Sequence, residues 1–384
     1  MGTTFFVLAL LQCALLFFLS RVGSRLDREE RKPAPQRTHW PRTGLIVPAG
    51  GNHPRMREAL ESLLRQDYPA LYPVIVTATA DEPAAGIARE LQARYPQLRH
   101  VVAGFAKGCG QKNHNSLKGV AAVEVELLAF CDSTHIAPRD FIRRLVAPVV
   151  DGEDFSTGYH KVVARDAGIV TMAYALCVQL MRYLQGISSF TQLWGGAMCF
   201  RLSAFRRYGV REFWMTNVVD DCSLADRLIR LGARIRLSAD AVLMTEARDH
   251  DLGVWRHWMD RQILFLKFCI PCQWVLLGVL ACLMLLPVLW AVLALLGVLL
   301  GKLSFGWLLG VLAYAAALAL VLRGWARFQE SVFPVWRWMV AFCASACMFV
   351  WVYLGTILAE GVLWQGIWYE VGRQGRVIRM RRQK

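Results

Sequence analysis

Long apolar runs lie near both ends of the chain, and a stretch of mixed composition separates them. Residues 3–20 carry no charged side chain over 18 positions, which is just long enough for a helix to cross a bilayer. Further apolar runs cover 271–300 and 303–322, with a short turn at Lys302 between them, and another covers 338–360. The pattern predicts a transmembrane anchor at 1–21 and transmembrane or re-entrant helices within 271–360.

Between residues 43 and 250, short apolar runs alternate with segments of helical spacing. The expected strands are TGLIVPAG, YPVIVTATADEP, LRHVVAG and VELLAFCDST, and the first expected helices are MREALESLLRQD and GIARELQARYP. Alternation of this kind favours a mostly parallel sheet, in which ligands bind beyond the carboxyl ends of the strands. Asp81, Glu82 and Asp132 follow such ends. We therefore expect one α/β domain with a polar site at this edge.

The basic residues gather beside the apolar runs. The net charge is +15, and the two main groups are Arg21, Arg25, Arg28, Arg31, Lys32, Arg37 and Arg42, and Arg373, Arg376, Arg379, Arg381, Arg382 and Lys384. Positive charge that flanks a membrane segment marks its cytosolic side and attracts anionic lipid headgroups. This placement favours a membrane partner and argues against nucleic acid. We interpret 22–42 as a juxtamembrane linker and 361–384 as a basic cytosolic tail.

The membrane topology contains one conflict. Charge follows the first apolar run, so we expect an uncleaved anchor with the N-terminus outside and the domain in the cytosol. Residues 251–270 are amphipathic, basic and rich in Trp, which predicts an interface helix. If 338–360 crossed fully, the basic tail would lie outside, against the positive-inside rule. We therefore interpret 338–360 as re-entrant or partly interfacial.

An ordered series of motifs accompanies this pattern. The motifs are LIVPAGGN, DYPALYPVIV, ADEPA, GCGQKNHNSLKG, FCDST, GGAMCFRLSAF, VVDDCSLADRLIRLGARIRLS and WQGIWYEVGRQGRV. The series resembles that of family 2 (GT-A) glycosyltransferases, most closely ceramide glucosyltransferases and related bacterial lipid glycosyltransferases. It covers about residues 45–262 and 364–377. The resemblance implies a Rossmann-like GT-A catalytic domain at 43–250, with a mixed, mostly parallel sheet, joined to α-helical transmembrane segments.

The resemblance assigns two acidic positions to the sugar donor. Asp81 and Glu82 match the first conserved carboxylate, near the uridine, and Glu82 fits better because it directly precedes Pro83. Asp132 matches the second, beside the metal and the diphosphate, which implies Mg²⁺ or Mn²⁺. The general family has two acids in a DxD motif, whereas this chain has Asp132 followed by Ser and Thr. An exposed acidic turn and a strand-end cap are the structural alternatives.

Three further residues match catalytic or phosphate-binding positions. Asp221 matches the catalytic base, although it, like Asp220, could instead cap the helix that follows. Lys112 matches a basic residue near the diphosphate. Arg261 matches the arginine of the QxxRW motif, with both of its neighbours changed. Its guanidinium could pair with the donor diphosphate or with a lipid phosphate.

The acceptor side is expected from positions that match the family's acceptor-proximal wall. These are Trp194, Gly195 and Met198, with Tyr159 and His160 nearby in the matched order. Core packing is an alternative for each of them, and His160 is a packed polar residue more often than a ligand.

The resemblance implies inverting transfer of a sugar, most plausibly glucose from UDP-glucose, to the hydroxyl of a membrane lipid such as ceramide. The expected location is an integral protein of a bacterial inner membrane or its equivalent, with the catalytic domain in the cytosol. A processive polysaccharide synthase and a catalytically inactive membrane scaffold are the alternatives.

Overall fold

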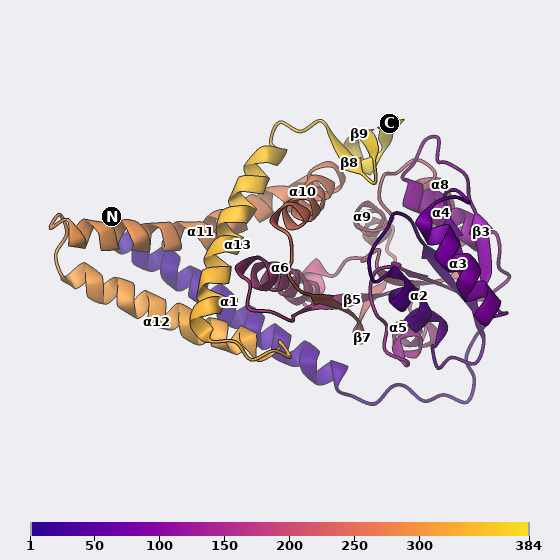
Figure 1. The fold of residues 1–384 in the computed structure, drawn as a ribbon, viewed down its shortest axis with the longest axis horizontal. Helices are drawn as coiled ribbons and strands as arrows, with labels where there is room; N and C mark the ends of the chain where they lie inside the picture. Colours follow the sequence, from indigo (N-terminus) through magenta and orange to yellow (C-terminus); the bar gives the residue numbers. More distant parts are fainter. Residues whose placement is uncertain (1, 383–384) are drawn as a thin grey trace.

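The computed structural model, which describes residues 2–382, combines an α/β domain with a set of long helices (Figure 1). The domain is built on β1 (Thr43–Pro48), β2 (Leu71–Thr77), β3 (Arg99–Val102), β4 (Leu127–Cys131), β5 (Phe155–Ala164), β6 (Ala197–Arg201) and β7 (Ile235–Ala247). Their order is β3-β2-β1-β4-β6-β5-β7, and β6 alone runs antiparallel to its neighbours β4 and β5. The predicted mixed, mostly parallel sheet is confirmed.

Side chains that alternate along the strands pack against two separate layers of helices, one on each face of the sheet. Leu45 and Val47 of β1 face a layer that contains α2 (Met56–Leu64), α3 (Pro83–Arg94) and α5 (Phe141–Val150). Ile46 faces the opposite layer, with α4 (Gln111–Val120), α7 (Leu202–Arg207), α8 (Val210–Trp214) and α9 (Cys222–Arg230). Both faces of the strands are apolar, because a parallel sheet is covered on both sides.

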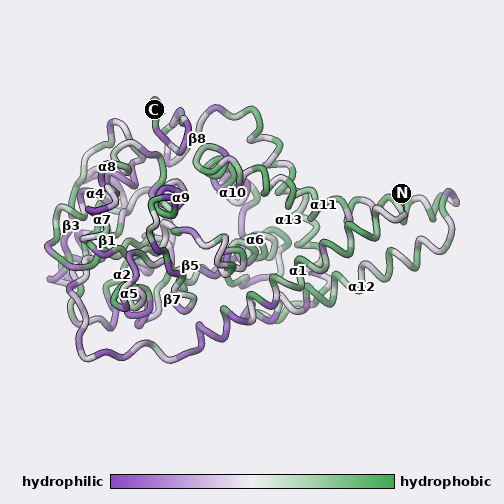
Figure 2. The backbone as a smooth tube through the Cα atoms, turned by 180° about the vertical axis from the view of Figure 1, so that it is seen from behind, coloured by the Kyte–Doolittle hydropathy of each residue, from purple (hydrophilic) through white to green (hydrophobic). Residues whose placement is uncertain are grey.

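Four helices are long and apolar enough to cross a membrane, by length and composition, among residues 2–382. They are α1 (Gly2–Glu30), α11 (Pro271–Leu299), α12 (Gly306–Ala326) and α13 (Val335–Thr356). The hydrophobic stretches of α1, α11 and α12 extend away from the domain, and α13 lies beside α6 (Ile169–Gln185) and α10 (Leu252–Cys269) (Figure 2). Leu10, Leu299 and Leu320 on their surfaces are at least 70% exposed, as expected for side chains that face lipid.

Two boundaries differ from the expectation. α1 continues to Glu30, so the first part of the predicted linker is helical. Glu30 pairs with Lys161 and Arg182 of the domain, and these contacts hold the end of the helix. The region 338–360 contains most of α13, which is one unbroken helix with no turn of the kind a re-entrant segment needs. Its position relative to the bilayer stays a prediction.

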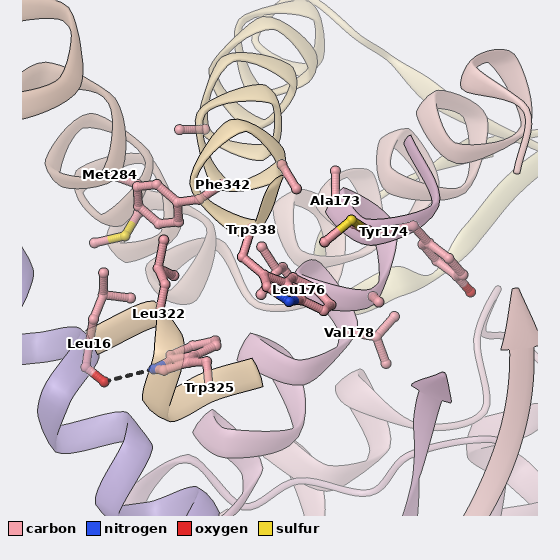
Figure 3. Packing of buried hydrophobic residues seen from close by; sticks show 14 of the residues in the cluster. Leu16, Ala173, Tyr174, Leu176, Val178, Met284, Leu322, Trp325, Trp338 and Phe342 are labelled. Carbon is pink, nitrogen blue, oxygen red and sulfur yellow. Dashed lines mark hydrogen bonds between the residues drawn. The ribbon is translucent and has the colours of Figure 1, made fainter. Parts of the chain in front are cut away.

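Two helices connect the domain to the long helices. α6 packs against both β5 and α13, and α10 packs against α11 and α13. Trp338 and Phe342 of α13 meet Leu176 of α6 in a shared core (Figure 3). α10 forms where the amphipathic interface helix is expected. The domain is therefore fixed to the bundle through continuous packing.

The basic C-terminal segment is folded, whereas we expected a tail. β8 (Gly361–Trp364), β9 (Ile367–Val371) and β10 (Val377–Arg382) form an antiparallel sheet. Ile367, Tyr369 and Val371 alternate with exposed residues and pack on Val218 and Val219, which explains why the segment folds despite its charge. Residues 1 and 383–384, which belong to the predicted anchor and tail, lie outside the described residues.

A buried polar contact joins α1 to a proline in α11. Pro287 lies within α11 and has no N–H to donate to the carbonyl of Leu283, four residues earlier. Gln12 is fully buried in α1, and its Nε2 donates to the carbonyls of Leu283 at 3.2 Å and Met284 at 2.8 Å. Tyr314 of α12 donates to the other end of the Gln12 amide at 2.6 Å. Gln12 thus donates a hydrogen bond to the carbonyl of Leu283, which lipid could not do.

We expect Gln12→Leu to lower the free energy of unfolding by about 1 kcal/mol, the scale of polar contacts between membrane helices. Pro287→Ala returns an N–H to the helix, so Gln12→Leu should cost less in that background. Denaturation of the detergent-solubilised protein measures the cycle, with Leu10→Ala on the exposed face of α1 as the control. An equal loss of stability from Gln12→Leu in the parent protein and in Pro287→Ala would contradict the role assigned to Gln12.

Candidate active site

A cavity of about 1560 Å³ lies beyond the carboxyl ends of the central strands and continues between the long helices. Its polar end includes Pro48–Gly50 after β1 and Asp132 after β4. The strand order reverses between β1 and β4, since β2 and β3 lie on the other side of β1. Crevices at such reversal points are where open α/β sheets bind ligands.

Lys112 is the centre of the charged residues in this cavity. It lies in the first turn of α4, and its Nζ is 2.8 Å from Oδ1 of Asp132 and 2.9 Å from Oδ2 of Asp220. Nζ also donates to the carbonyl of Gly195 at 2.9 Å. Three of the expected site residues, Lys112, Asp132 and Gly195, are therefore brought together around one ammonium group.

Burial and neighbouring charges shift the pKa values of Lys112 and Asp220. Burial acts to lower the pKa of Lys112, but Asp132, Asp220 and Asp221 together raise it well above its usual value. Burial raises the pKa of Asp220 to about 6, against the attraction of the Lys112 ammonium, and Asp221 and Asp132 raise it further. Lys112 is thus charged at neutral pH, and Asp220 titrates closer to neutrality than an exposed carboxyl.

Asp221 lies at the start of α9 and also lines the cavity. Its Oδ1 accepts a hydrogen bond from the backbone N–H of Cys222 at 2.6 Å, and its Oδ2 accepts one from that of Gly195 at 2.9 Å. Asp221 therefore caps α9, as the structural alternative expects, and also lies in the cavity where a catalytic residue could act. The two backbone donors fix the carboxylate and leave each oxygen a further lone pair.

Asp132 is suited to hold a divalent cation together with phosphate oxygens. Its Oδ1 is occupied by Lys112, whereas Oδ2 has no hydrogen-bond partner among residues 2–382 and its side chain is 31% exposed. The nearest polar group is Nε2 of His135, at 3.9 Å from Oδ2. The described residues contain no group of three His, Cys, Asp or Glu side chains that could hold a metal alone.

The first acidic pair lies apart from this cluster. Glu82 precedes α3, and its Oε1 accepts hydrogen bonds from the backbone N–H groups of Ala78 at 2.5 Å and Thr79 at 3.0 Å. Asp81 is exposed. Neither lines the cavity. Glu82 organises the turn after β2, which matches the structural alternative, and its Oε2 faces Gly50 at the cavity edge.

Aromatic side chains form the wall beside Asp132. His160 stacks on Trp194 with ring centroids 4.8 Å apart, and His135 and Tyr159 contact the same indole. Burial lowers the pKa of His135 to about 4, although Asp132 opposes the shift, so this imidazole is neutral. Met198 differs from the expectation, because it is buried in β6 against Phe130 and Phe200 in the sheet core and does not line the cavity.

Arg261 extends from α10 into the same cavity. Its Nε is buried, and no residue in the described part of the chain accepts a hydrogen bond from it. Burial lowers the pKa of the guanidinium, but Asp132 opposes this, and an arginine stays protonated in proteins. A guanidinium whose Nε is buried without an acceptor is suited to an anionic ligand group.

The far part of the cavity is apolar and lies between the long helices. Its lining includes Leu15, Leu16 and Phe18 of α1, Leu176, Leu180 and Leu184 of α6, Leu276, Leu280 and Leu283 of α11, and Phe342 and Phe349 of α13. Trp325 borders this region and donates to the carbonyl of Leu16 at 3.0 Å (Figure 3). Polar and apolar parts form one continuous space.

Sequence reasoning missed several residues of the cavity. Asp220 was considered only as a cap, yet it is buried against Lys112. His135 had no signal beyond its place three residues after Asp132. Trp364 and Gln365 line the cavity from the turn between β8 and β9, where Gln365 has a φ of 49° and Gly366 a φ of 73°. The motif WQGIW carried that signal, because Gly next to a polar residue is typical of a tight hairpin turn.

We expect Lys112→Met to destabilise the fold by about 3 kcal/mol, because it leaves the buried carboxylate of Asp220 and the half-buried one of Asp132 without their counter-charge. Asp220→Asn should recover part of this loss, since it removes one of the two unpaired charges. Chemical denaturation of the solubilised protein measures both. The control is Lys118→Met, on the exposed side of the same helix; an equal loss there would refute the role of the contacts.

The raised pKa of Asp220 predicts a pH-dependent stability. The unfolded carboxyl loses its proton near pH 3.8 and the folded one near 6, so the folded state binds more protons between these values. The contribution of Asp220 to the free energy of unfolding should therefore fall as the pH rises from about 4 to 6. In Asp220→Asn this contribution is lost, so thermal stability should change more favourably with rising pH across this range than in the parent protein. An unchanged pH dependence would exclude Asp220 as the titrating group.

Known proteins resemble the chain in sequence and in fold. In fold, the chain is similar to the mannosyltransferase PcManGT from Pyrobaculum calidifontis, solved in complex with GDP-Man and Mn²⁺, with a TM-score of 0.53 and 19% identity over 90% of this chain and 98% of that one. A weaker likeness, to S. aureus TarS 1–349, has a TM-score of 0.35 and 16% identity over 58% of this chain and 65% of that one. The first likeness supports a shared α/β glycosyltransferase fold.

The family comparison covers more of the chain. The motifs resemble those of family 2, whereas the family model that matches is "Glycosyl transferase family 21", over residues 4–377. Because this match spans almost the whole described sequence, the chain belongs to glycosyl transferase family 21.

Proposed function

We propose that this chain transfers a sugar from a nucleoside diphosphate sugar to the hydroxyl group of a membrane lipid. The observation that carries the proposal is the continuity of one cavity. The Lys112–Asp132–Asp220–Asp221 cluster lines its polar end, and apolar side chains of α1, α6, α11 and α13 line the other. A polar donor and a lipid acceptor can meet in such a space.

The donor diphosphate has two cationic partners in this proposal. The unpartnered guanidinium of Arg261 can donate to phosphate oxygens, and Asp132 can hold Mg²⁺ or Mn²⁺ against them. Bound there, the cation would supply positive charge to the leaving diphosphate. The nucleoside would extend towards Pro48–Gly50 after β1. UDP-glucose is the donor that the motif resemblance favours, and it stays part of the proposal.

Asp221 is the proposed general base. Backbone N–H groups of Gly195 and Cys222 hold its carboxylate in the wall of the cavity. Asp221 would accept the proton of the lipid hydroxyl while the hydroxyl oxygen bonds to the anomeric carbon and the bond to the diphosphate breaks. Attack from the face opposite the leaving group inverts that carbon, so the reaction needs no covalent sugar–enzyme intermediate.

The acceptor is proposed to be a lipid with long apolar chains, such as ceramide. The apolar lining between the long helices fits hydrocarbon chains. This part of the cavity is continuous with the part walled by Trp194 and His160. A polysaccharide channel would need polar groups along its path, whereas Leu and Phe side chains dominate this part of the lining. The intact ion-pair cluster also favours an active enzyme over an inactive scaffold.

The proposed orientation places the α/β domain in the cytosol. Arg21, Arg25 and Arg28 occupy the end of α1 nearest the domain, where positive charge favours the cytosolic side. The donor sugar nucleotides of the cytosol would then reach the polar end of the cavity directly. Basic residues at this level would contact anionic lipid headgroups.

The full-length protein in lipid nanodiscs, supplied with radiolabelled sugar nucleotides and total membrane lipid, tests the proposal. We expect transfer to an organic-soluble product, and Asp221→Asn should lower its rate at least about 100-fold, the scale of a lost general base. Binding of the nucleotide should change little. Asp226→Asn on the same helix is the matched control. Absence of transfer from every sugar nucleotide would refute the function, and an active Asp221→Asn would refute the base.

A further inference from the structure

Asp132 and His135 face each other across a gap without a hydrogen bond. Oδ2 of Asp132 and Nε2 of His135 are 3.9 Å apart, which is longer than a hydrogen bond allows. Oδ1 of the same carboxylate is held by Lys112 at 2.8 Å. The Lys112 ammonium therefore sets the orientation of Asp132 and leaves Oδ2 directed to the imidazole.

The imidazole is fixed from its other side. Nδ1 of His135 is 2.7 Å from Oγ1 of Thr245 on β7, and Oγ1 is in turn 3.4 Å from Nδ1 of His160. The hydroxyl can accept from one ring and donate to the other. Rings of Trp194 and His160 pack on His135. Outer contacts of this kind hold a metal-ligating histidine in position.

The gap is narrow enough for one cation to contact both groups. Bonds from a small divalent cation to an imidazole nitrogen or a carboxylate oxygen are about 2.1 Å long, so one ion can reach both atoms across 3.9 Å. The chain lacks the second acid of a DxD motif, because Ser133 and Thr134 follow Asp132. His135 is the next residue, and its ring lies where a second ligand is needed.

We propose that Nε2 of His135 and Oδ2 of Asp132 are the two protein ligands of the divalent cation, with oxygens of a nucleoside diphosphate and water completing the shell. The inference rests on the proposed function, since it concerns the cation of the same donor site. No third His, Cys, Asp or Glu joins the pair within residues 2–382, so the diphosphate is needed for tight binding.

An imidazole ligand has a chemical consequence for metal choice. Carboxylate and water oxygens suit Mg²⁺ and Mn²⁺ alike, whereas imidazole nitrogen favours transition metals. His135 therefore makes the site prefer Mn²⁺ over Mg²⁺. His135→Asp, which puts a second carboxylate at this position, should reverse that preference, and His135→Asn should weaken Mn²⁺ binding at least about 10-fold.

Pulsed electron paramagnetic resonance of Mn²⁺ bound to the full-length protein in detergent, with UDP as the probe diphosphate, tests the ligand directly. We expect a ¹⁴N coupling that becomes a ¹⁵N coupling after ¹⁵N-histidine labelling and disappears in His135→Asn. Competition with Mg²⁺ measures the metal preference. His39→Asn, in the exposed linker, is the matched control, and thermal unfolding verifies that each variant is folded.

The outcomes separate this inference from the proposed function. A histidine nitrogen coupling that persists in His135→Asn, or that is absent from the parent protein, overturns the inference. A preference for Mn²⁺ over Mg²⁺ that is unchanged in His135→Asp also contradicts it. If sugar transfer proceeds in EDTA at the full rate, the proposed function stands and the cation site fails. If Mn²⁺ binds through His135 but no sugar is transferred, the site stands and the function fails.

Discussion

The ammonium group of Lys112 joins four separate segments of the chain. Its own helix α4, Asp132 after β4, Asp220 before α9 and the carbonyl of Gly195 before β6 all meet at Nζ. Without this group, the carboxylates would repel one another in a place with little water. With it, three acidic side chains still face a single ammonium. The proposed donor diphosphate would add more negative charge, so the cluster would require additional cations, and Arg261 could supply one.

Close packing between α1 and α6 fixes the bundle relative to this cluster. A side chain at Gly23 would meet the ring of Tyr183, and one at Gly186 would meet Val22. Small residues let the helices approach, as is common between membrane helices. Arg25 also donates to the carbonyl of Gly186, and Glu30 pairs with the domain. The apolar part of the cavity is therefore held in a set position relative to Asp221.

Local patterns predicted the elements better than they predicted the contacts. Short continuous apolar runs such as LIVP and LLAFC predicted β1 and β4, and the acids at the ends of such runs include Asp132. The pairing of Lys112 with Asp220 depends on segments about 100 residues apart, which no local pattern contains. The resemblance predicts that Glu82 lies near the donor, and in the structure one of its carboxylate oxygens accepts hydrogen bonds from the backbone N–H groups of Ala78 and Thr79. Along β6, Ala197 and Cys199 face one helix layer and Met198 faces the other, so the Met198 side chain packs in the core.

The C-terminal sheet shows why charge alone was a poor guide to structure. Basic residues dominate 373–382, yet β9 buries Tyr369, whose hydroxyl accepts a hydrogen bond from the backbone N–H of Gln111, one residue before Lys112. Two residues before Asp220, the backbone N–H of Val218 donates to the carbonyl of Gly375. Both contacts support the segments that carry the charged cluster. Because β8 follows α13 after a few residues, one continuous segment joins the end of the bundle to the strands that support the charged cluster.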